Sequence, residues 1–194
     1  MTDLSRVIEN SGVVLKYCEG IKNPKIIEFG GGNNRLVLPY KVDELDYIRL
    51  KKGDMIADLE KRLPIKSNSY DIIFSSSVFE HVFNIKQLFN ECHRILRPEG
   101  KLICFIPHFA SLSSIHFLHQ KFFSTTSFGV LTEIDTDFNY EFRGKLWKIV
   151  EMRITCPLKF LEPLINLNQR FYEGTILKNI VPPRFLVVVL EKVL

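Results

Sequence analysis

Residues 25–35 read KIIEFGGGNNR: an apolar run that carries one acidic residue leads into three glycines and two asparagines. Glycine allows the backbone to turn sharply and to approach a ligand that a Cβ atom would push away. We interpret residues 25–29 as a buried strand and Gly30, Gly31 and Gly32 as the loop at its end. Taken alone, this loop fits a ligand-binding turn and a plain tight turn equally well, because isolated glycine motifs are weak evidence.

The sequence on either side of this stretch predicts a parallel sheet covered by helices. Near-helical periodicity predicts an amphipathic helix or a pair of turns over residues 3–20. It also predicts a helix over 84–97, with Asn84 as its N-cap. Strands that are apolar throughout and separated by helices are typical of a parallel sheet covered on both faces. Apolar runs predict further strands at 36–42, 53–59, 70–77, 101–106, 145–154 and 184–193.

Composition bounds the class of protein. The 194 residues are 46% hydrophobic and 25% charged, which is ordinary for a globular domain. We expect one domain with three parts: a helical segment 1–24, a cofactor-binding core 25–106, and an acceptor-side insert with closing strands at 107–194.

Charge, cysteines and the N-terminus exclude several classes of partner. The net charge is only +4 and no basic run is interleaved with aromatic residues, so no nucleic-acid partner is expected. The four cysteines form no CxxC pair, so no metal site is expected. No signal segment and no apolar stretch long enough to span a bilayer is found, which favours a cytoplasmic protein. The oligomeric state stays open.

Two acidic residues come at the ends of later apolar runs. Asp43 closes the run at 36–42, where a carboxylate can accept hydrogen bonds from both hydroxyls of a ribose. Asp58 ends the run at 53–59, where a carboxylate can accept one from the exocyclic amino group of adenine. Because the carboxyl ends of parallel strands meet at one edge, we expect both beside the glycine loop, where open α/β sheets bind ligands.

The order and spacing of these motifs resemble those of class I S-adenosylmethionine-dependent methyltransferases, in particular their small-molecule branch. The resemblance implies a Rossmann-like α/β fold with a mostly parallel seven-stranded sheet, an antiparallel last strand and helices on both faces. It also implies S-adenosylmethionine as the cofactor. The matching segments, all within residues 25–108, are IIEFGGGNN, VDEL, ADLEKRLPIKSNSYDIIFSSSVFEHV and LFNECHRILRPEGKLICFIPH.

Carried over by position, the resemblance implies the cofactor contacts. Glu28 and the glycine backbone would face the methionine end of the cofactor, Asp43 the ribose and Asp58 the adenine, while Ser75 would line the floor of the methyl-transfer cleft. The residues expected to bind the cofactor are therefore Glu28, Gly30, Gly31, Gly32, Asp43, Asp58, Leu59 and Ser75.

The chain departs from the family pattern at three places. Asn34 stands where many members have a third glycine, and Glu99 replaces the first glycine of a Pro-Gly-Gly turn. The gap from Gly32 to Asp43 is also too short for a full crossover helix, so we expect a shortened connection after the first strand. A sulfonium cofactor has no phosphate that a helix N-terminus must neutralise, so this shortening favours S-adenosylmethionine over NAD.

Methyl transfer is a displacement in which the acceptor attacks the methyl group on sulfur, and a base is needed only where the acceptor must lose a proton. The candidate bases are His108, His119 and His81, although a structural role is the commoner one for a histidine. The leading prediction is a small-molecule acceptor methylated on a hydroxyl. A sugar, a lipid-linked compound and a phenol all fit, with the aromatic-rich segment 105–128 as the acceptor pocket.

Two other classes of function compete with this prediction. Asn34 and Glu99 favour a methyltransferase-fold module that works by interaction and does no chemistry, whereas the pair Asp43 and Asp58 argues against it. An NAD(P)-dependent reductase is the third hypothesis. The missing third glycine and the absence of a Tyr-x-x-x-Lys pair speak against it.

Overall fold

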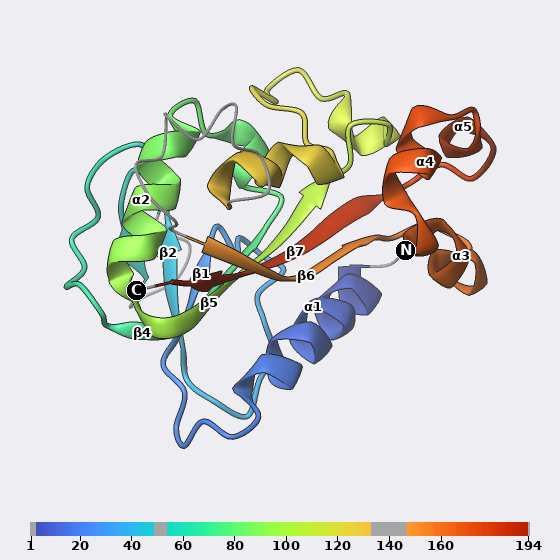
Figure 1. The fold of residues 1–194 in the computed structure, drawn as a ribbon. Helices are drawn as coiled ribbons and strands as arrows, with labels where there is room; N and C mark the ends of the chain where they lie inside the picture. The colour runs from blue at the N-terminus through green and yellow to red at the C-terminus, as the bar shows by residue number, and fades with distance from the viewer. Residues whose placement is uncertain (1–2, 49–53, 133–146, 194) are drawn as a thin grey trace.

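The computed structural model describes residues 3–48, 54–132 and 147–193. Seven strands form one sheet in the order β3-β2-β1-β4-β5-β7-β6. The strands from β3 to β5 are parallel neighbours, and β7 runs antiparallel between β5 and β6 (Figure 1). The sheet therefore confirms the predicted fold class, including the antiparallel last strand. Its members are β1 (Ile26–Phe29), β2 (Val42–Asp46), β3 (Met55–Ile56), β4 (Tyr70–Ser76), β5 (Leu96–Pro107), β6 (Trp147–Ile154) and β7 (Phe185–Lys192).

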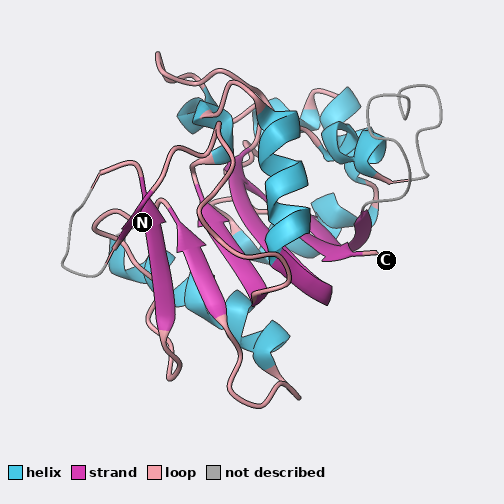
Figure 2. Cartoon of the chain, turned by 90° about the vertical axis from the view of Figure 1, so that its left-hand side faces the viewer, coloured by secondary structure: helices cyan, strands magenta, loops and turns pink. Residues whose placement is uncertain are grey.

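Helices cover both faces of this sheet (Figures 1 and 2). Helix α1 (Asp3–Cys18) packs with Val14 and Cys18 on one apolar cluster, which contains Ile72 and Phe74 of β4. Helix α2 (Ile85–Ile95) packs on the opposite face, over a larger cluster. Successive residues of a strand point to opposite faces, which is why a strand that is apolar throughout can serve both clusters.

Helix α2 confirms the clearest periodic pattern of the sequence. Asn84 is its N-cap, and the Asn84 side chain accepts a hydrogen bond from the backbone N–H of Gln87 at 3.2 Å. Leu88, Phe89 and Cys92 are buried along one side of the helix. The helix ends at Ile95, and β5 begins at the next residue, Leu96.

The prediction that residues 36–42 form the second strand is wrong, because β2 begins only at Val42. Pro39 cannot donate a ladder hydrogen bond, so it disfavours a strand at 36–42. Leu36 is buried in the cluster beneath α1, and Leu38 and Tyr40 pack against that cluster. The connection between β1 and β2 contains turns but no helix, as the short spacing predicted.

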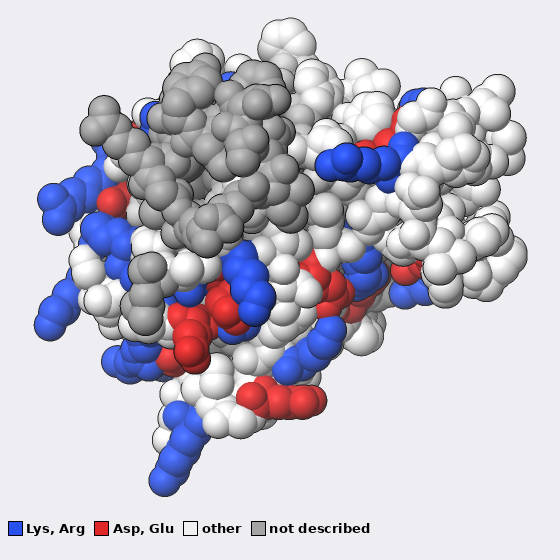
Figure 3. Space-filling view, in the orientation of Figure 1, with Lys and Arg blue, Asp and Glu red and all other residues white. Residues whose placement is uncertain are grey.

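Three short helices fill the connection from β6 to β7. They are α3 (Glu162–Leu167), α4 (Gln169–Gly174) and α5 (Leu177–Ile180). On the face in Figure 3, basic and acidic side chains are interspersed over the sheet and α1, while the end that carries α3–α5 is mostly uncharged. None of the described helices is long and apolar enough to cross a membrane.

Candidate functional site

A cleft of about 440 Å³ lies where the first four strands end. Its lining comes from the residues that follow β1, β2, β3 and β4, which are parallel neighbours and so end at the same edge of the sheet. This is the position at which open α/β sheets bind ligands. The lining residues are Gly30, Leu45, Asp46, Tyr47, Ala57, Asp58, Leu59, Glu60, Ser77, Val78, His81 and Val82.

Gly30 is the member of the glycine loop that lines the cleft. Its φ angle is +66°, a left-handed conformation that side chains rarely adopt. Its N–H donates to the carbonyl of Leu45 at 2.8 Å, which ties the loop to the end of β2. A Cβ atom here would lie 2.4 Å from Cγ2 of Val78, so the backbone approaches the neighbouring loop as closely as only glycine allows.

Asp58 and Leu59 lie in the cleft, where the sequence predicted them. Oδ1 of Asp58 accepts the N–H of Glu60 at 3.0 Å, and this hydrogen bond, with help from Lys61, lowers the pKa of the carboxyl group. The Lys61 ammonium lies 3.2 Å from Oδ2. Asp58 therefore presents an ionised carboxylate to the cleft near neutral pH.

Asp43 lies elsewhere, and the prediction that it marks the carboxyl end of β2 is wrong. It is the second residue of β2, beside Ile27 of β1, and its carboxylate accepts a hydrogen bond from the hydroxyl of Tyr70 at 2.9 Å. Asp43 and Tyr70 line a different hollow, with Lys41, near the strand beginnings. The acid that stands at the carboxyl end of β2 and lines the cleft is Asp46.

The other predicted cofactor residues lie next to the cleft without belonging to its lining. Glu28 is buried, and its Oε2 accepts the N–H of Leu36 at 2.8 Å. A Cβ atom on Gly31 would approach the carboxyl groups of Glu28 and Glu44, so Gly31 packs on two acidic side chains. Gly32 has φ +56° and continues the turn. Ser75 is buried in β4, and its hydroxyl has no hydrogen-bond partner among the described residues.

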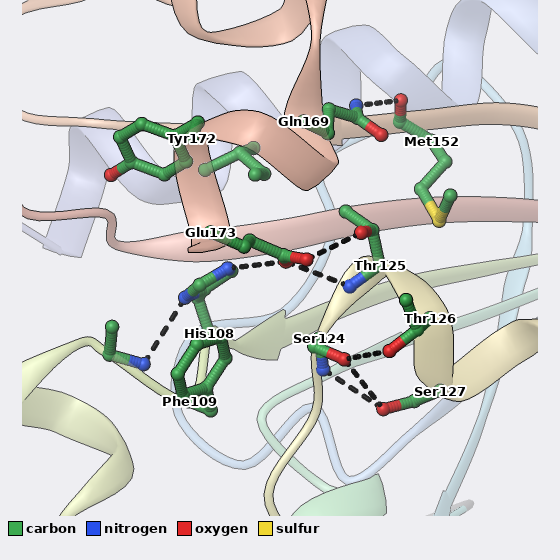
Figure 4. A network of polar contacts seen from close by, with 12 residues as sticks. His108, Phe109, Ser124, Thr125, Thr126, Ser127, Met152, Gln169, Tyr172 and Glu173 are labelled. Atoms are coloured by element: carbon green, nitrogen blue, oxygen red, sulfur yellow. Dashed lines mark hydrogen bonds and ion pairs between the residues drawn. The ribbon is translucent and has the colours of Figure 1, made fainter. Parts of the chain in front are cut away.

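His108 is unsuited to act as a base on an acceptor, contrary to its selection as a candidate. Its side chain is fully buried, with Nε2 2.8 Å from Oε1 of Glu173 and Nδ1 accepting the N–H of Ala110 at 3.2 Å (Figure 4). Glu173 also accepts two hydrogen bonds from Thr125. Burial raises the pKa of Glu173, but the hydrogen bonds from His108 and Thr125 outweigh burial and lower it. His108 therefore joins β5 to α4 as part of a saturated network.

His81 and His119 lie together on the cleft side. Their ring centroids are 4.7 Å apart, and His81 is part of the cleft lining. Nδ1 of His119 is 2.9 Å from the carbonyl of Ser114, and burial lowers the pKa of this imidazole. Of the three candidate histidines, His81 lines the cleft, and His119 packs against it with a side chain that is 7% exposed.

Two polar residues that line this cleft, Asp46 and Ser77, were not predicted from the sequence. Asp46 was hidden by the wrong register of β2. Ser77 lines the cleft with a left-handed φ of +57°, and its hydroxyl accepts a hydrogen bond at 2.6 Å from Arg6 of α1. A serine at a strand end and an arginine 71 positions earlier carry no shared signal in the sequence.

Comparison with known proteins agrees with this geometry. A family model described as "Methyltransferase domain" matches residues 40–104. An uncharacterised protein of Methanocaldococcus jannaschii is 30% identical over 116 residues, which are 55% of this chain and 51% of that protein. This chain thus spans about half the length of that relative.

Solved structures share the fold over almost the whole chain. An S-adenosylmethionine-dependent methyltransferase from Archaeoglobus fulgidus superposes with a TM-score of 0.65 at 14% identity, over 98% of this chain and 95% of that chain. A second, from Mesorhizobium loti, has a TM-score of 0.57 at 15% identity, over 96% and 100%. A cyclase, SpnF, has a TM-score of 0.58 at 10% identity, over 95% and 80%. The chain is therefore similar to a methyltransferase domain over residues 40–104, and it has the fold of solved S-adenosylmethionine-dependent methyltransferases.

Proposed function

We propose that this protein binds S-adenosylmethionine in the cleft at the ends of β1–β4 and transfers its methyl group to a small-molecule acceptor. The observation that carries the proposal is the convergence of Gly30, Asp46 and Asp58 on one cleft. A volume of about 440 Å³ falls within the usual range for sites that hold a small ligand.

The two carboxylates of the cleft fit the nucleoside of the cofactor, one at the ribose and one at the adenine. Asp46 is the last residue of the strand next to the glycine loop, a position where a carboxylate can accept hydrogen bonds from ribose hydroxyls. Asp58 comes after the next strand outward, and its ionised carboxylate accepts a hydrogen bond from an exocyclic amine. Gly30 lets the loop pass close to Val78 beside these carboxylates, because any side chain at this position would collide with Val78.

A hydroxyl is the acceptor group that this site favours. Alignment of acceptor and sulfonium is the main catalytic requirement, and a hydroxyl must in addition lose a proton. His81 lies at the cleft, and the lowered pKa of His119 keeps that imidazole neutral and able to accept a proton. The leading alternative is a module that binds partners without chemistry. The cyclase among its structural relatives shows that this fold also serves proteins that are not named as methyltransferases.

The two aspartates of β2 provide a matched test. Isothermal titration with S-adenosylhomocysteine, with NADH as the control ligand, measures the affinity of wild type, Asp46→Asn, Asp58→Asn and Asp43→Asn. Each charged hydrogen bond is worth about 1.5–3 kcal/mol. We therefore expect Asp46→Asn and Asp58→Asn to weaken binding roughly 10- to 100-fold, and Asp43→Asn to leave it unchanged.

Each outcome separates the hypotheses. Loss of binding in Asp43→Asn alone would restore the sequence-based assignment over the one proposed from the cleft. Absence of S-adenosylhomocysteine binding in the wild-type protein would reject the cofactor and leave the interaction module. Tight NADH binding would favour a reductase.

A further inference from the structure

A second group of polar side chains lies beside the cofactor cleft. Glu80 and His81 belong to the 3-10 turn Phe79–His81 that follows β4, and His119 comes from the segment after β5. One ligand atom of each residue lies within 4.8 Å of those of the other two. The N–H groups of Gln120 and Lys121 donate to the carbonyl of Glu80, at 2.7 and 3.2 Å, so the two segments are joined next to the group.

The carboxylate of Glu80 makes no hydrogen bond of good geometry, although the hydroxyl of Ser77, its own backbone N–H and the charge of Arg6 lie near enough to act on it. The residue is 1% exposed, and neither of its carboxylate oxygens has a hydrogen-bond partner among the residues that the structure describes. A buried carboxylate without a partner is costly, and such groups call for an explanation. Nε2 of His119 lies 4.0 Å from Oε1 of Glu80, too far for a hydrogen bond. A cation between these two atoms would satisfy both.

Backbone carbonyls select the same tautomer in both imidazoles. Nδ1 of His119 lies 2.9 Å from the carbonyl of Ser114, and Nδ1 of His81 lies 3.3 Å from the carbonyl of Leu118. A carbonyl can only accept, so each Nδ1 carries the proton and each Nε2 keeps its lone pair in the neutral ring. Proteins orient metal-binding histidines in this way, with the second nitrogen donating to a carbonyl or carboxylate.

We propose that Glu80, His81 and His119 bind one divalent transition-metal ion, such as Zn²⁺, beside the cofactor cleft. Two imidazoles and a carboxylate suit Zn²⁺ and its neighbours in the first transition series, and three protein ligands leave a coordination position open. Ligand distances of about 2.0–2.2 Å require the three atoms to close up by roughly 1 Å. The exposed side chain of His81 can rotate to do so. The cysteine spacing gave no hint of this site, because the site contains no cysteine.

The position of the site gives the ion a role if the proposed function holds. His81 lines the cofactor cleft as well, so a bound ion lies next to the cofactor. With the ion bound, the Nε2 atoms of His81 and His119 are ligands and no longer accept a proton; the ion itself would polarise a coordinated hydroxyl and lower its pKa. This role of the ion rests on the proposed function. In it, the metal selects acceptors that can coordinate through an oxygen atom.

Metal binding itself is tested without cofactor or acceptor. Tag-free protein, freed of metal by chelator and dialysis, is titrated with ZnCl₂ by calorimetry and with CoCl₂ by visible absorption. We expect one equivalent of Zn²⁺ with a micromolar or lower Kd, and visible absorption bands on Co²⁺ binding. Glu80→Gln and His119→Gln should each weaken Zn²⁺ binding at least tenfold. His93→Gln is the control, because His93 lies on α2 and contacts the carbonyl of Val193.

The same samples separate folding, cofactor and metal. The melting temperature and the S-adenosylhomocysteine affinity are measured for each variant; if Glu80→Gln does not fold, His119→Gln and His81→Gln decide the matter. Failure of the wild-type protein to bind Zn²⁺ at up to millimolar concentration would overturn the site. Equal binding by the ligand variants and His93→Gln would do the same, since it would point to scattered surface histidines. Zn²⁺ binding without S-adenosylhomocysteine binding would keep the metal site and reject the proposed cofactor.

Discussion

Position 30 imposes two requirements, a left-handed backbone and no Cβ atom, that only glycine meets together. Its φ of +66° is strained for a side chain, and a Cβ atom would lie 2.4 Å from Val78. We expect Gly30→Ala to lower the free energy of unfolding by about 1–3 kcal/mol, the usual size of such strain. The substitution should also weaken S-adenosylhomocysteine binding, because the displaced Val78 lines the same cleft. Thermal unfolding and calorimetry measure the two effects.

Gly12 provides the control for this substitution. It lies in α1 with open space around its Cβ position. Alanine there should stabilise the helix by about 0.5–1 kcal/mol without changing affinity. If Gly30→Ala behaved like Gly12→Ala, the close contact of the loop with Val78 would not matter for the site.

Glu99 carries backbone strain at the position where the family turn has glycine. Its φ is +62°, in the bulge where the pairing of β4 and β5 shifts from Leu96 to Lys101. A left-handed conformation costs a side-chain-bearing residue about 1–2 kcal/mol, part of which glycine loses again through unfolded-chain entropy. We therefore expect Glu99→Gly to stabilise the protein by about 0.5–1 kcal/mol.

Thermal unfolding tests this prediction. In a chain of this size, each kcal/mol of stabilisation raises the melting temperature by about 2–4 °C. Glu99→Ala is the matched control, since it removes the side chain and keeps the strained conformation. The Lys101 contact is to the Glu99 carbonyl and survives both changes. Equal melting temperatures for the two variants would show that the backbone angle carries no strain.

At the scale of elements, α1 does more than cover the sheet. Arg6 of α1 donates to the hydroxyls of Ser76 and Ser77 at 2.8 and 2.6 Å and lies over the ring of Phe185, 4.9 Å from its centroid. It thereby fixes the end of β4, where Ser77 lines the cleft in a left-handed conformation. The first helix therefore fixes one wall of the cleft.

We expect Arg6→Met to lower the free energy of unfolding by about 1–3 kcal/mol, because methionine keeps the apolar stem and loses the charged hydrogen bonds. S-adenosylhomocysteine affinity should fall with it as Ser77 is released. Lys16→Met is the control on the same helix: its ion pair with Glu151 is exposed on the lysine side, so its loss costs about 0–1 kcal/mol. Unchanged affinity in Arg6→Met would show that α1 covers the sheet without positioning the site.

The elements that the sequence predicted well are those with a strong pattern of their own. Helix α2 repeats its apolar residues with helical period and carries an N-cap, and β4 is a continuous apolar run. Strand β2 reads VDELD, with Leu45 as its buried residue, and becomes a strand because it pairs with β1 and β3 on both sides. Tertiary pairing overrode local propensity there, so the sequence placed Asp43 at the carboxyl end of the strand, where the structure has Asp46.

At the scale of the whole molecule, the sequence could predict which residues share one edge of the sheet. It could not predict side-chain contacts between elements that are distant in the chain. Parallel topology alone brings Gly30 and Asp58 to one edge, as expected. The burial of His108 depends on Glu173, 65 residues away, and the contact of Arg6 depends on Ser77, 71 residues away. Such pairs arise from packing of distant elements, for which one sequence carries no periodic signal.

Glu28 couples the stability of the whole fold to pH. Burial raises its pKa from the ordinary value of 4.5 to about 8, and the neighbouring carboxylate of Glu44 adds to the shift. The N–H of Leu36 and the charge of Arg35 offset only part of it. The folded protein therefore holds a proton on Glu28 at pH values where the unfolded chain has released it.

The sign of the effect follows from proton uptake. Between about pH 5 and 8 the folded state binds more protons than the unfolded state, so the free energy of unfolding falls as the pH rises through this window. Each pKa unit is worth about 1.4 kcal/mol, so the loss amounts to a few kcal/mol. Below pH 4.5 the stabilisation is fully present, and it is exhausted once the pH passes the folded pKa near 8.

Glu28→Gln should remove this dependence. Glutamine still accepts the N–H of Leu36 through its amide oxygen, and its NH₂ group can donate to Glu44, with no proton to lose. We expect the variant to match the wild-type melting temperature near pH 5 and to exceed it by several degrees at pH 8. Melting curves at half-unit pH steps measure this. A constant difference between the two proteins at every pH would contradict the raised pKa, because it would mean that Glu28 is ionised throughout. Glu80, whose pKa burial raises to about 7, is present in both proteins, so its contribution cancels in the comparison.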